Sequence, residues 1–249
     1  MIINDKLFNL FKDKAQETQV DLLCLGLGYT VVVTSDGGIG IAYTYFANKK
    51  SCMVLNEAID YEGRPASALL EKIKSDATIE RSMALALINA LNYQDALQLP
   101  EDEKNEILFE KFNITKGTKV SMVGYFGPLI KRFEQRGAVL DILDQSRGLG
   151  RMQEFYKKLK NWAEVLFLTS TSILNSSTEE VLANVHGKVQ TLMLGPSTPM
   201  VAGAFDHLPV HMLAGTVPLD RENIVKAVRH GMGTPVLHRF SRKSYLNLV

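Results

Sequence analysis

The spacing of hydrophobic positions changes along the chain, and each change indicates a different kind of structure. Residues 1–17 place apolar side chains at helical intervals with lysines between them, which predicts an amphipathic helix. Short apolar stretches separated by turn residues follow, which predicts antiparallel strands at 22–25, 29–34 and 40–45. Residues 65–93 return to helical spacing. The first part of the chain is therefore expected to be a small α+β module.

The pattern of hydrophobic residues changes again after a charged stretch that contains one short amphipathic helix. Strands and helices then alternate, and the strands are nearly continuous apolar runs, which is typical of a parallel sheet covered on both faces. The predicted strands are 119–124, 138–144, 164–170, 189–195 and 209–215, and the predicted helices are 127–137, 151–162, 178–187 and 220–232.

The fold class predicted from these patterns is α/β, with a small α+β domain followed by a Rossmann-like parallel-sheet domain. The expected boundaries are residues 1–98 for the first domain, 99–117 for a linker helix and 118–249 for the second domain.

Composition narrows the class of protein. With 46% hydrophobic and 22% charged residues, the chain has the balance of an ordinary soluble globular protein. The formal net charge is +1 and the basic residues are spread along the chain, so nucleic acid is not expected as a partner. The N-terminal helix lacks the continuous apolar centre of a signal peptide, and no apolar run is long enough to span a bilayer. A cytoplasmic protein with no membrane partner is expected.

The loops after the parallel strands are the candidates for a ligand site. Such loops emerge at one edge of the sheet, and ligands bind in the crevice outside that edge. Here they are GYFGP (Gly124–Pro128), the end of the second strand at Asp144, TSTSILNSST (Thr169–Thr178) and GPSTPM (Gly195–Met200). Because small and polar residues are concentrated in several loops of one edge, a pocket is expected there.

The first of these loops resembles a nucleotide-binding turn without its fingerprint. Gly124 and Gly127 allow the backbone to approach a ligand, and Pro128 suits the first turn of a helix. The spacing is neither GxGxxG nor GxxxxGK[ST], so a phosphate site is not specified. Tyr125 and Phe126 could stack on a flat ring, although Phe126 could equally pack under the helix.

The other loops offer hydrogen-bonding groups. Asp144 follows the glycine turn by roughly 20 residues, the distance at which an acid contacts a ribose hydroxyl, but a helix cap is the alternative. Thr169, Thr171 and Asn175 could orient a polar ligand. The prolines of GPSTPM hold Ser197 and Thr198 in a loop that is either a rigid turn or a ligand contact.

Metal ligands have no recognisable spacing. Cys24 and Cys52 lie far apart within apolar runs and are expected to be buried small hydrophobes. His207 and His211 are separated by Pro209 in a strand context, so they do not form a helical metal pair.

The motifs GYFGP, TSTSILNSST and GPSTPM, in this order and at these strand ends, resemble the family described as "putative heavy-metal chelation". In the first half, GYTVVV at 28–33 and INA at 88–90 are similar to the domain that accompanies it, which has an enolase N-terminal-like fold. The resemblance implies an active site at the junction of the two domains. The chain departs from the family pattern at Ser170 and Ser176, where glycines are usual.

Two functions follow from the residues and the resemblance. The first is an enzyme-like site for a flat heterocycle or for a nucleotide-like or S-adenosylmethionine-like cofactor, acting in condensation or hydrolysis of a pterin-, flavin- or siderophore-like compound. Asn175 and Thr171 are its predicted catalytic residues. The predicted binding residues share a strand-end loop or face it from the first domain: Gly124, Tyr125, Phe126, Gly127, Pro128, Asp144, Thr169, Ser197, Thr198, Tyr29 and Thr30.

The second function is a non-catalytic protein that binds or delivers a heavy metal or a metal complex. Few thiols and scattered histidines argue against a soft bare ion, so oxygen ligands such as Glu57, Asp60, Asp141 and Asp144 would have to serve. In both cases the partner is a small molecule or ion, and self-association into a homo-oligomer stays open.

Overall fold

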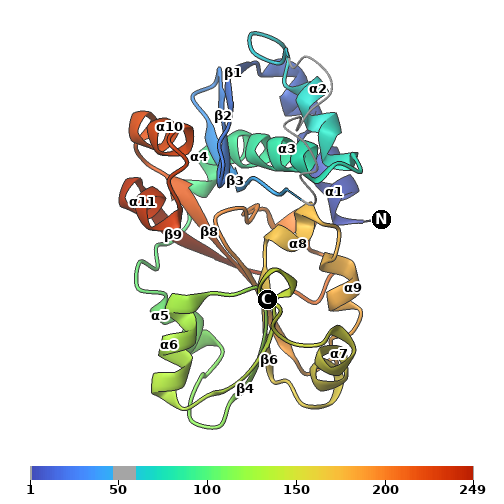
Figure 1. Cartoon of the computed structure of the whole chain (residues 1–249). Coiled ribbons are helices and arrows are strands. Elements are labelled where there is room, and N and C mark those ends of the chain that lie inside the picture. Colours follow the sequence, from blue (N-terminus) through green and yellow to red (C-terminus); the bar gives the residue numbers. More distant parts are fainter. Residues whose placement is uncertain (1, 47–59, 249) are drawn as a thin grey trace.

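The computed structural model describes residues 2–46 and 60–248. It has a two-domain layout (Figure 1), with an N-terminal module from α1 to α4 and a C-terminal module from α5 to β9. The first module contains a three-stranded antiparallel sheet, and the second contains a six-stranded, mostly parallel sheet. The predicted α/β class, with a small α+β part followed by a parallel-sheet part, is confirmed.

The N-terminal module packs its sheet against helices. Its elements are α1 (Ile3–Glu17), β1 (Val20–Leu25), β2 (Tyr29–Thr34), β3 (Ile39–Tyr43), α2 (Ser67–Leu70), η1 (Glu71–Lys74), α3 (Thr78–Leu91) and α4 (Tyr93–Ala96). The strand order is β1-β2-β3. Helix α3 lies so close to β3 that a Cβ added to Gly40 would stand 2.2 Å from Ala86 O and Ala90 N. Glycine is therefore required where the strand crosses the helix.

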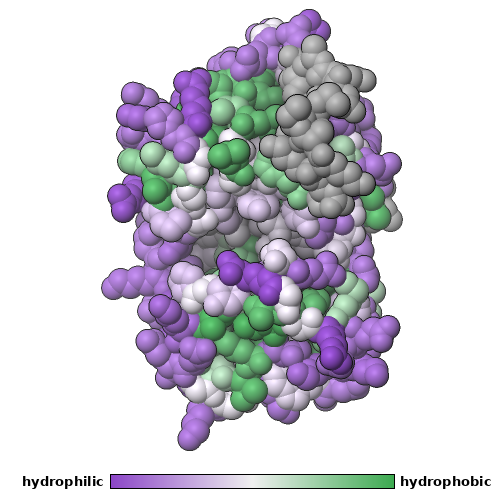
Figure 2. All heavy atoms as spheres, viewed as in Figure 1, coloured by the Kyte–Doolittle hydropathy of each residue, from purple (hydrophilic) through white to green (hydrophobic). Residues whose placement is uncertain are grey.

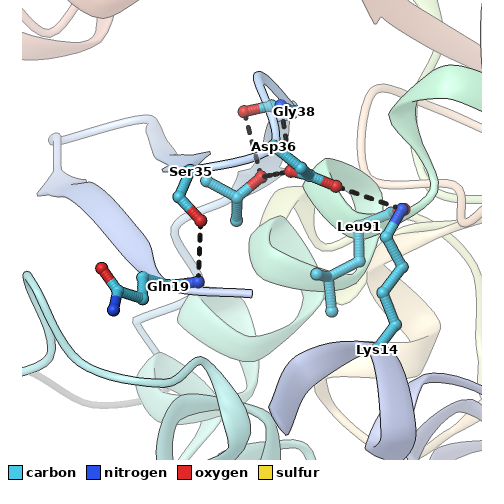
Figure 3. A network of polar contacts seen from close by, with 7 residues as sticks. Lys14, Gln19, Ser35, Asp36, Gly38 and Leu91 are labelled. Carbon is cyan, nitrogen blue, oxygen red and sulfur yellow. Dashed lines mark hydrogen bonds and ion pairs between the residues drawn. The ribbon is translucent and has the colours of Figure 1, made fainter. Parts of the chain in front are cut away.

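The turn between β2 and β3 is fixed to two helices by Asp36 (Figure 3). Its carboxylate accepts hydrogen bonds from Thr34 Oγ1 at 2.7 Å and Gly38 N at 3.3 Å, and it pairs with Lys14 Nζ at 3.3 Å. Lys14, from α1, also donates to Leu91 O at the end of α3. Although burial alone would raise the pKa of Asp36, the bonds from Thr34 and Lys14 lower it below its ordinary value.

The C-terminal module is a sheet of order β5-β4-β6-β7-β8-β9. Its strands are β4 (Lys119–Val123), β5 (Val139–Leu143), β6 (Val165–Thr169), β7 (Gln190–Leu194), β8 (Met212–Pro218) and β9 (Ser241–Asn247). Its helices are α5 (Glu106–Lys111), α6 (Gly127–Arg136), η2 (Gln145–Arg147), α7 (Met152–Asn161), α8 (Thr171–Leu174), α9 (Thr178–Leu182), η3 (Ala202–Ala204), α10 (Arg221–Arg229), α11 (Thr234–Leu237) and η4 (His238–Phe240).

Strand β9 and the end of helix α9 are among the parts of this module that differ from the sequence prediction. Strand β9 was not predicted, because SRKSYLN is not an apolar run; it pairs antiparallel with β8 along seven residues, from Met212↔Asn247 to Pro218↔Ser241. The predicted helix 178–187 ends at Leu182, after which Asn184 N and Val185 N donate to carbonyls three residues earlier.

The two modules share their packing. One apolar cluster of the C-terminal sheet is covered by α5 and α6. A second cluster joins the other face, with α7, α8 and α9, to α1 and α3 of the N-terminal module. A third packs α10 against the N-terminal sheet, where β1 and β2 lie nearest to the helix (Figure 1). The C-terminal module therefore contributes a helix to the N-terminal sheet, and the junction is a buried interface. Among the described residues, no helix has both the length and the apolar character needed to cross a membrane.

Candidate site at the junction of the modules

A cavity of about 630 Å³ lies where the carboxyl edge of the parallel sheet meets the N-terminal module. We call it the junction cavity; its lining includes Tyr125–Leu129 after β4, Thr169–Thr171 at the end of β6 and Leu194–Ser197 at the end of β7. The space-filling view of this face shows a hollow at mid-height, between the two modules (Figure 2). This volume is within the range of pockets that hold small organic molecules.

The sheet register sets the floor of the cavity. Thr169 pairs with Leu194, Leu194 with Ala214, and Ala214 with Tyr245, so one row of residues crosses four strands. Strands β8 and β9 continue past this row, and their paired residues Thr216 and Lys243 line a wall of the cavity. The loop after β7 can turn beside the floor because Gly195 has a φ of +134°, and a Cβ there would stand 2.6 Å from Ser170 Oγ.

Aromatic side chains from both modules line the cavity. Tyr29 and Tyr43 come from neighbouring strands of the N-terminal sheet and contact each other edge to face, with ring centroids 6.1 Å apart. Tyr29 Oη is bonded to Thr234 Oγ1, and burial raises the pKa of this phenol, so it stays protonated at neutral pH. Tyr125 lies beneath the guanidinium of Arg147, 4.5 Å from the ring centroid. These rings give the cavity surfaces on which a flat molecule can stack.

Sequence reasoning missed the wall formed by the stretch before α5, by η4 and by β9. Asp102, His238 and Lys243 line the cavity here. His238 Nε2 lies 3.4 Å from Thr216 Oγ1. Burial, together with the charge of Lys243, lowers the pKa of His238, so its imidazole is neutral at pH 7. No motif marks these residues; only the antiparallel return of β9 brings them to the sheet edge.

Several residues that line the cavity have a buried polar atom with no hydrogen-bond partner among the described residues. These atoms are Asp102 Oδ2, Ser170 Oγ and Ser244 Oγ, and their residues are 7%, 1% and 2% exposed. Buried polar groups are bonded in most proteins because an unmade bond is costly. Groups left unbonded on a cavity are those that a polar ligand could satisfy.

The structure brings many of the predicted site residues together. Those that line the cavity are Tyr29, Tyr125, Phe126, Gly127, Pro128, Thr169, Thr171 and Ser197. Ser197 also joins the modules, since its Oγ accepts from Tyr43 N at 2.7 Å.

Other predicted residues lie outside the cavity lining and have structural partners. Asn175 Oδ1 accepts from Ser177 N and Ser177 Oγ, and Asp144 caps η2 by accepting from Arg147 N. Thr30 Oγ1 pairs with Thr44, and Thr198 Oγ1 donates to Gly195 O.

Gly124 also lies outside the lining but shapes its edge. Its φ is +90°, and a Cβ there would stand 3.0 Å from Thr169 Cβ, so the glycine lets the end of β4 lie close to the end of β6.

A family model described as "Putative heavy-metal chelation" (DUF364) matches residues 107–247. This segment is more than half of the 249 residues. The chain belongs to this family. A second model with the same description (DUF4213) matches residues 8–92. The resemblance predicted from the motifs is confirmed. Among curated proteins, none matches the chain.

Solved structures of this family share the fold. A protein of unknown function from Desulfitobacterium hafniense DCB-2 superposes with a TM-score of 0.79 at 20% identity, covering 98% of this chain and 97% of its own. A protein of unknown function from Pyrococcus horikoshii gives a TM-score of 0.81 at 16% identity, covering 99% of this chain and 100% of its own. At these identities the likeness shows the architecture alone.

The description of the family raises the question of metal ligands in this chain. Among the described residues, no three or more His, Cys, Asp or Glu side chains are grouped to hold an ion. Asp141 pairs with Lys158 at 2.7 Å, and Asp60 pairs with Arg64. Glu57 and Cys52 lie outside the described residues.

His211 and Cys24 also have side chains of types that bind metals, and each contacts other groups of the protein. His211 Nδ1 accepts from Thr191 N at 2.9 Å, and burial lowers the pKa of this imidazole. Burial raises the pKa of the Cys24 thiol, although Arg229 beside it acts in the opposite direction. A raised pKa disfavours the thiolate that binds soft metals.

Proposed function

We propose that this protein binds a small organic molecule with a flat ring in the junction cavity. The observation that carries the proposal is the cavity itself, in which aromatic side chains of both modules meet polar groups at the ends of parallel strands. A mostly apolar pocket with a few convergent polar groups is typical of ligand sites. Pterin-, flavin-, siderophore-, nucleotide- and S-adenosylmethionine-like compounds are the candidate classes.

In an enzymatic version of this proposal, the cavity promotes a condensation or a hydrolysis. His238 is then the candidate general base, because its neutral imidazole can accept a proton and Thr216 lies beside it. Thr171, predicted from sequence as catalytic, lines the cavity and would contact the ligand. Asn175 lies outside the lining, so it would affect the ligand only by positioning the loop that contains it.

A second candidate function is delivery of a heavy metal as a complex. It is favoured by the description of the family together with the lack of a grouped ligand set among the described residues. In this version the organic molecule supplies the metal donors, and the protein binds the complex through its ring and its polar edge. The metal is cargo, and no protein side chain need coordinate it.

The test is a binding screen by isothermal titration calorimetry. S-Adenosylmethionine, nucleotides, pterins, flavins and metal-loaded or metal-free siderophores would be titrated into the whole chain and into Thr171→Trp. Thr171 is half-buried on the cavity lining, so an indole there is expected to occupy part of the cavity, obstruct the ligand and lower affinity at least about tenfold.

The matched control is Thr115→Trp, at an exposed threonine outside the lining, which should bind as the unaltered chain does. Tighter binding of the metal-loaded compound than of its metal-free form would favour delivery. If no compound binds, or if both variants bind equally well, the proposal is wrong.

A further inference from the structure

Among the described residues that line the junction cavity, Asp102 is the acidic one, and the stretch before α5 positions it there. Its backbone N donates to Lys243 O at 2.9 Å, and the preceding Glu101 forms a bridge with Ser244. Asp102 is 7% exposed and lines the cavity beside β9. The wall of the last strand therefore carries a buried carboxylate.

One of its two oxygens has a structural role. Oδ1 accepts from Glu106 N at 2.7 Å, which satisfies a free amide in the first turn of α5. The residue preceding that helix, Asn105, makes no cap bond with its own side chain. Asp102 thus serves as the cap, and this explains why an acid with one bonded oxygen is here.

The second oxygen is not explained by the fold. Oδ2 has no hydrogen-bond partner among the described residues, and no described cation pairs with the carboxylate. Lys243, a basic side chain of this wall, donates its Nζ to Glu103 O at 2.8 Å instead. Ser244 Oγ, on the neighbouring strand position, is also without a partner. A carboxylate oxygen only accepts hydrogen bonds, so Oδ2 lacks a donor at this end of the cavity.

We infer that Asp102 determines specificity in the junction cavity by selecting ligands that present N–H donors at one edge, such as an amidine, an amino-substituted nitrogen heterocycle or an ammonium group. The inference rests on the proposed function and specifies the polar edge of its ligand. An N–H donor would satisfy Oδ2, and a charged one would also compensate the buried carboxylate. A ligand that offers only acceptors there would leave Oδ2 unbonded and would bring two acceptors together.

The experiment uses probes in matched pairs in which one member has a donor group that the other lacks. Benzamidine is compared with benzamide, and guanosine with inosine, by calorimetric titration of the whole chain. In each pair the first compound has the additional N–H donors. The inference predicts that the donor-rich member binds at least about tenfold more tightly, because a site built for a donor discriminates against the analogue that lacks it.

Asp102→Asn tests the residue. The amide is isosteric, so its oxygen can still accept from Glu106 N while an NH₂ group replaces Oδ2. The preference within each pair should disappear while the Tm stays close to that of the unaltered chain. The control is Asp220→Asn, which alters another helix-capping aspartate, bonded to Asn223 N at 3.0 Å and outside the cavity lining. It should keep the preference.

Equal affinities within both pairs on the unaltered chain, a preference retained in Asp102→Asn, or no binding by any donor-rich probe would each overturn the inference. The comparison of affinities within each pair uses the unaltered chain, so it tests the inference even if Asp102→Asn does not fold. After such a result, the proposed function would still be supported if other compounds bound the unaltered chain and Thr171→Trp abolished their binding. A chain that binds no compound of either screen would contradict both.

Discussion

The imidazole of His238 shows how one side chain of the cavity couples protonation to folding. Burial and the charge of Lys243 both lower its pKa, and Glu103 opposes them. The unfolded chain therefore takes up the proton first as the pH falls below about 6.5, the ordinary value for histidine. The stability that depends on the neutral ring is fully present above that pH and is lost as the pH falls through the lower pKa of the folded state.

We predict that the free energy of unfolding decreases between pH 7.5 and pH 5 and that His238→Asn reduces this decrease. Urea titrations at several pH values would measure it. The control is His186→Asn, at an exposed histidine, which should follow the pH dependence of the unaltered chain. Parallel curves for His238→Asn and the unaltered chain would show that His238 is not a source of the dependence. His211, whose pKa is also lowered by burial, is expected to account for part of what remains.

Only some of the individual residues of the candidate site could be predicted from the sequence. Tyr125, Thr169 and Ser197 lie at or shortly after the carboxyl ends of apolar strands, and the edge rule for parallel sheets places such residues together. Asp102 and His238 could not be found in this way, since neither follows a parallel strand. Asp102 lies in a charged stretch that resembles a solvent-exposed linker, and its burial depends on strand β9.

At the scale of elements, the contact between β3 and α3 depends on a residue without a side chain. Gly40 lies where the strand backbone meets the carbonyl of Ala86 and the amide of Ala90. Both neighbours are main-chain atoms of a buried helix, so they cannot move aside as the end of a flexible side chain could.

We predict that Gly40→Ala lowers the free energy of unfolding by about 3 kcal/mol, the upper part of the usual range for overpacking. For a chain of this size, the Tm would fall by roughly 10 °C. Gly28→Ala, in the turn between β1 and β2, is the control, because a Cβ there has no heavy atom within 4 Å, and its effect should lie within about 0.5 kcal/mol. Equal effects of the two substitutions would contradict the packing argument.

Three strands that the sequence predicted to within one residue at each end consist mainly of buried residues. Strands β4, β6 and β7 lie inside the sheet, so they appear in the sequence as apolar runs. Strand β9 lies at an edge and contains Arg242, Lys243 and Ser244, so its hydrophobicity is too low to identify it. What stabilises it is long-range: Arg242 donates to Ala96 O and Leu99 O and pairs with Glu101.

At the scale of the whole molecule, the two modules share a hydrophobic core. Unfolding of one module alone would expose apolar side chains of the other. One cluster contains Leu7 of α1, Leu87 of α3 and Leu213 of β8, each fully buried. Across the same junction, Asn92 Nδ2 donates to Met200 O, and Ile3 N donates to Glu179.

We therefore predict a single cooperative unfolding transition. Trp162, the one tryptophan of the chain, follows α7 and reports on the C-terminal module, whereas amide exchange along α3 reports on the N-terminal one. Urea titrations monitored by the two probes should coincide, and the calorimetric and van't Hoff enthalpies should agree. Separate midpoints would mean that the modules unfold independently.

The junction cavity takes its walls from segments that are distributed from Tyr29 to Tyr245. Contacts of such long sequence separation require many chain segments to be ordered first, so they form late in folding. A ligand has nothing to bind until they do. Occupancy of the cavity would consequently lengthen the lifetime of the native state by slowing unfolding, while leaving the rate at which the chain folds nearly unchanged.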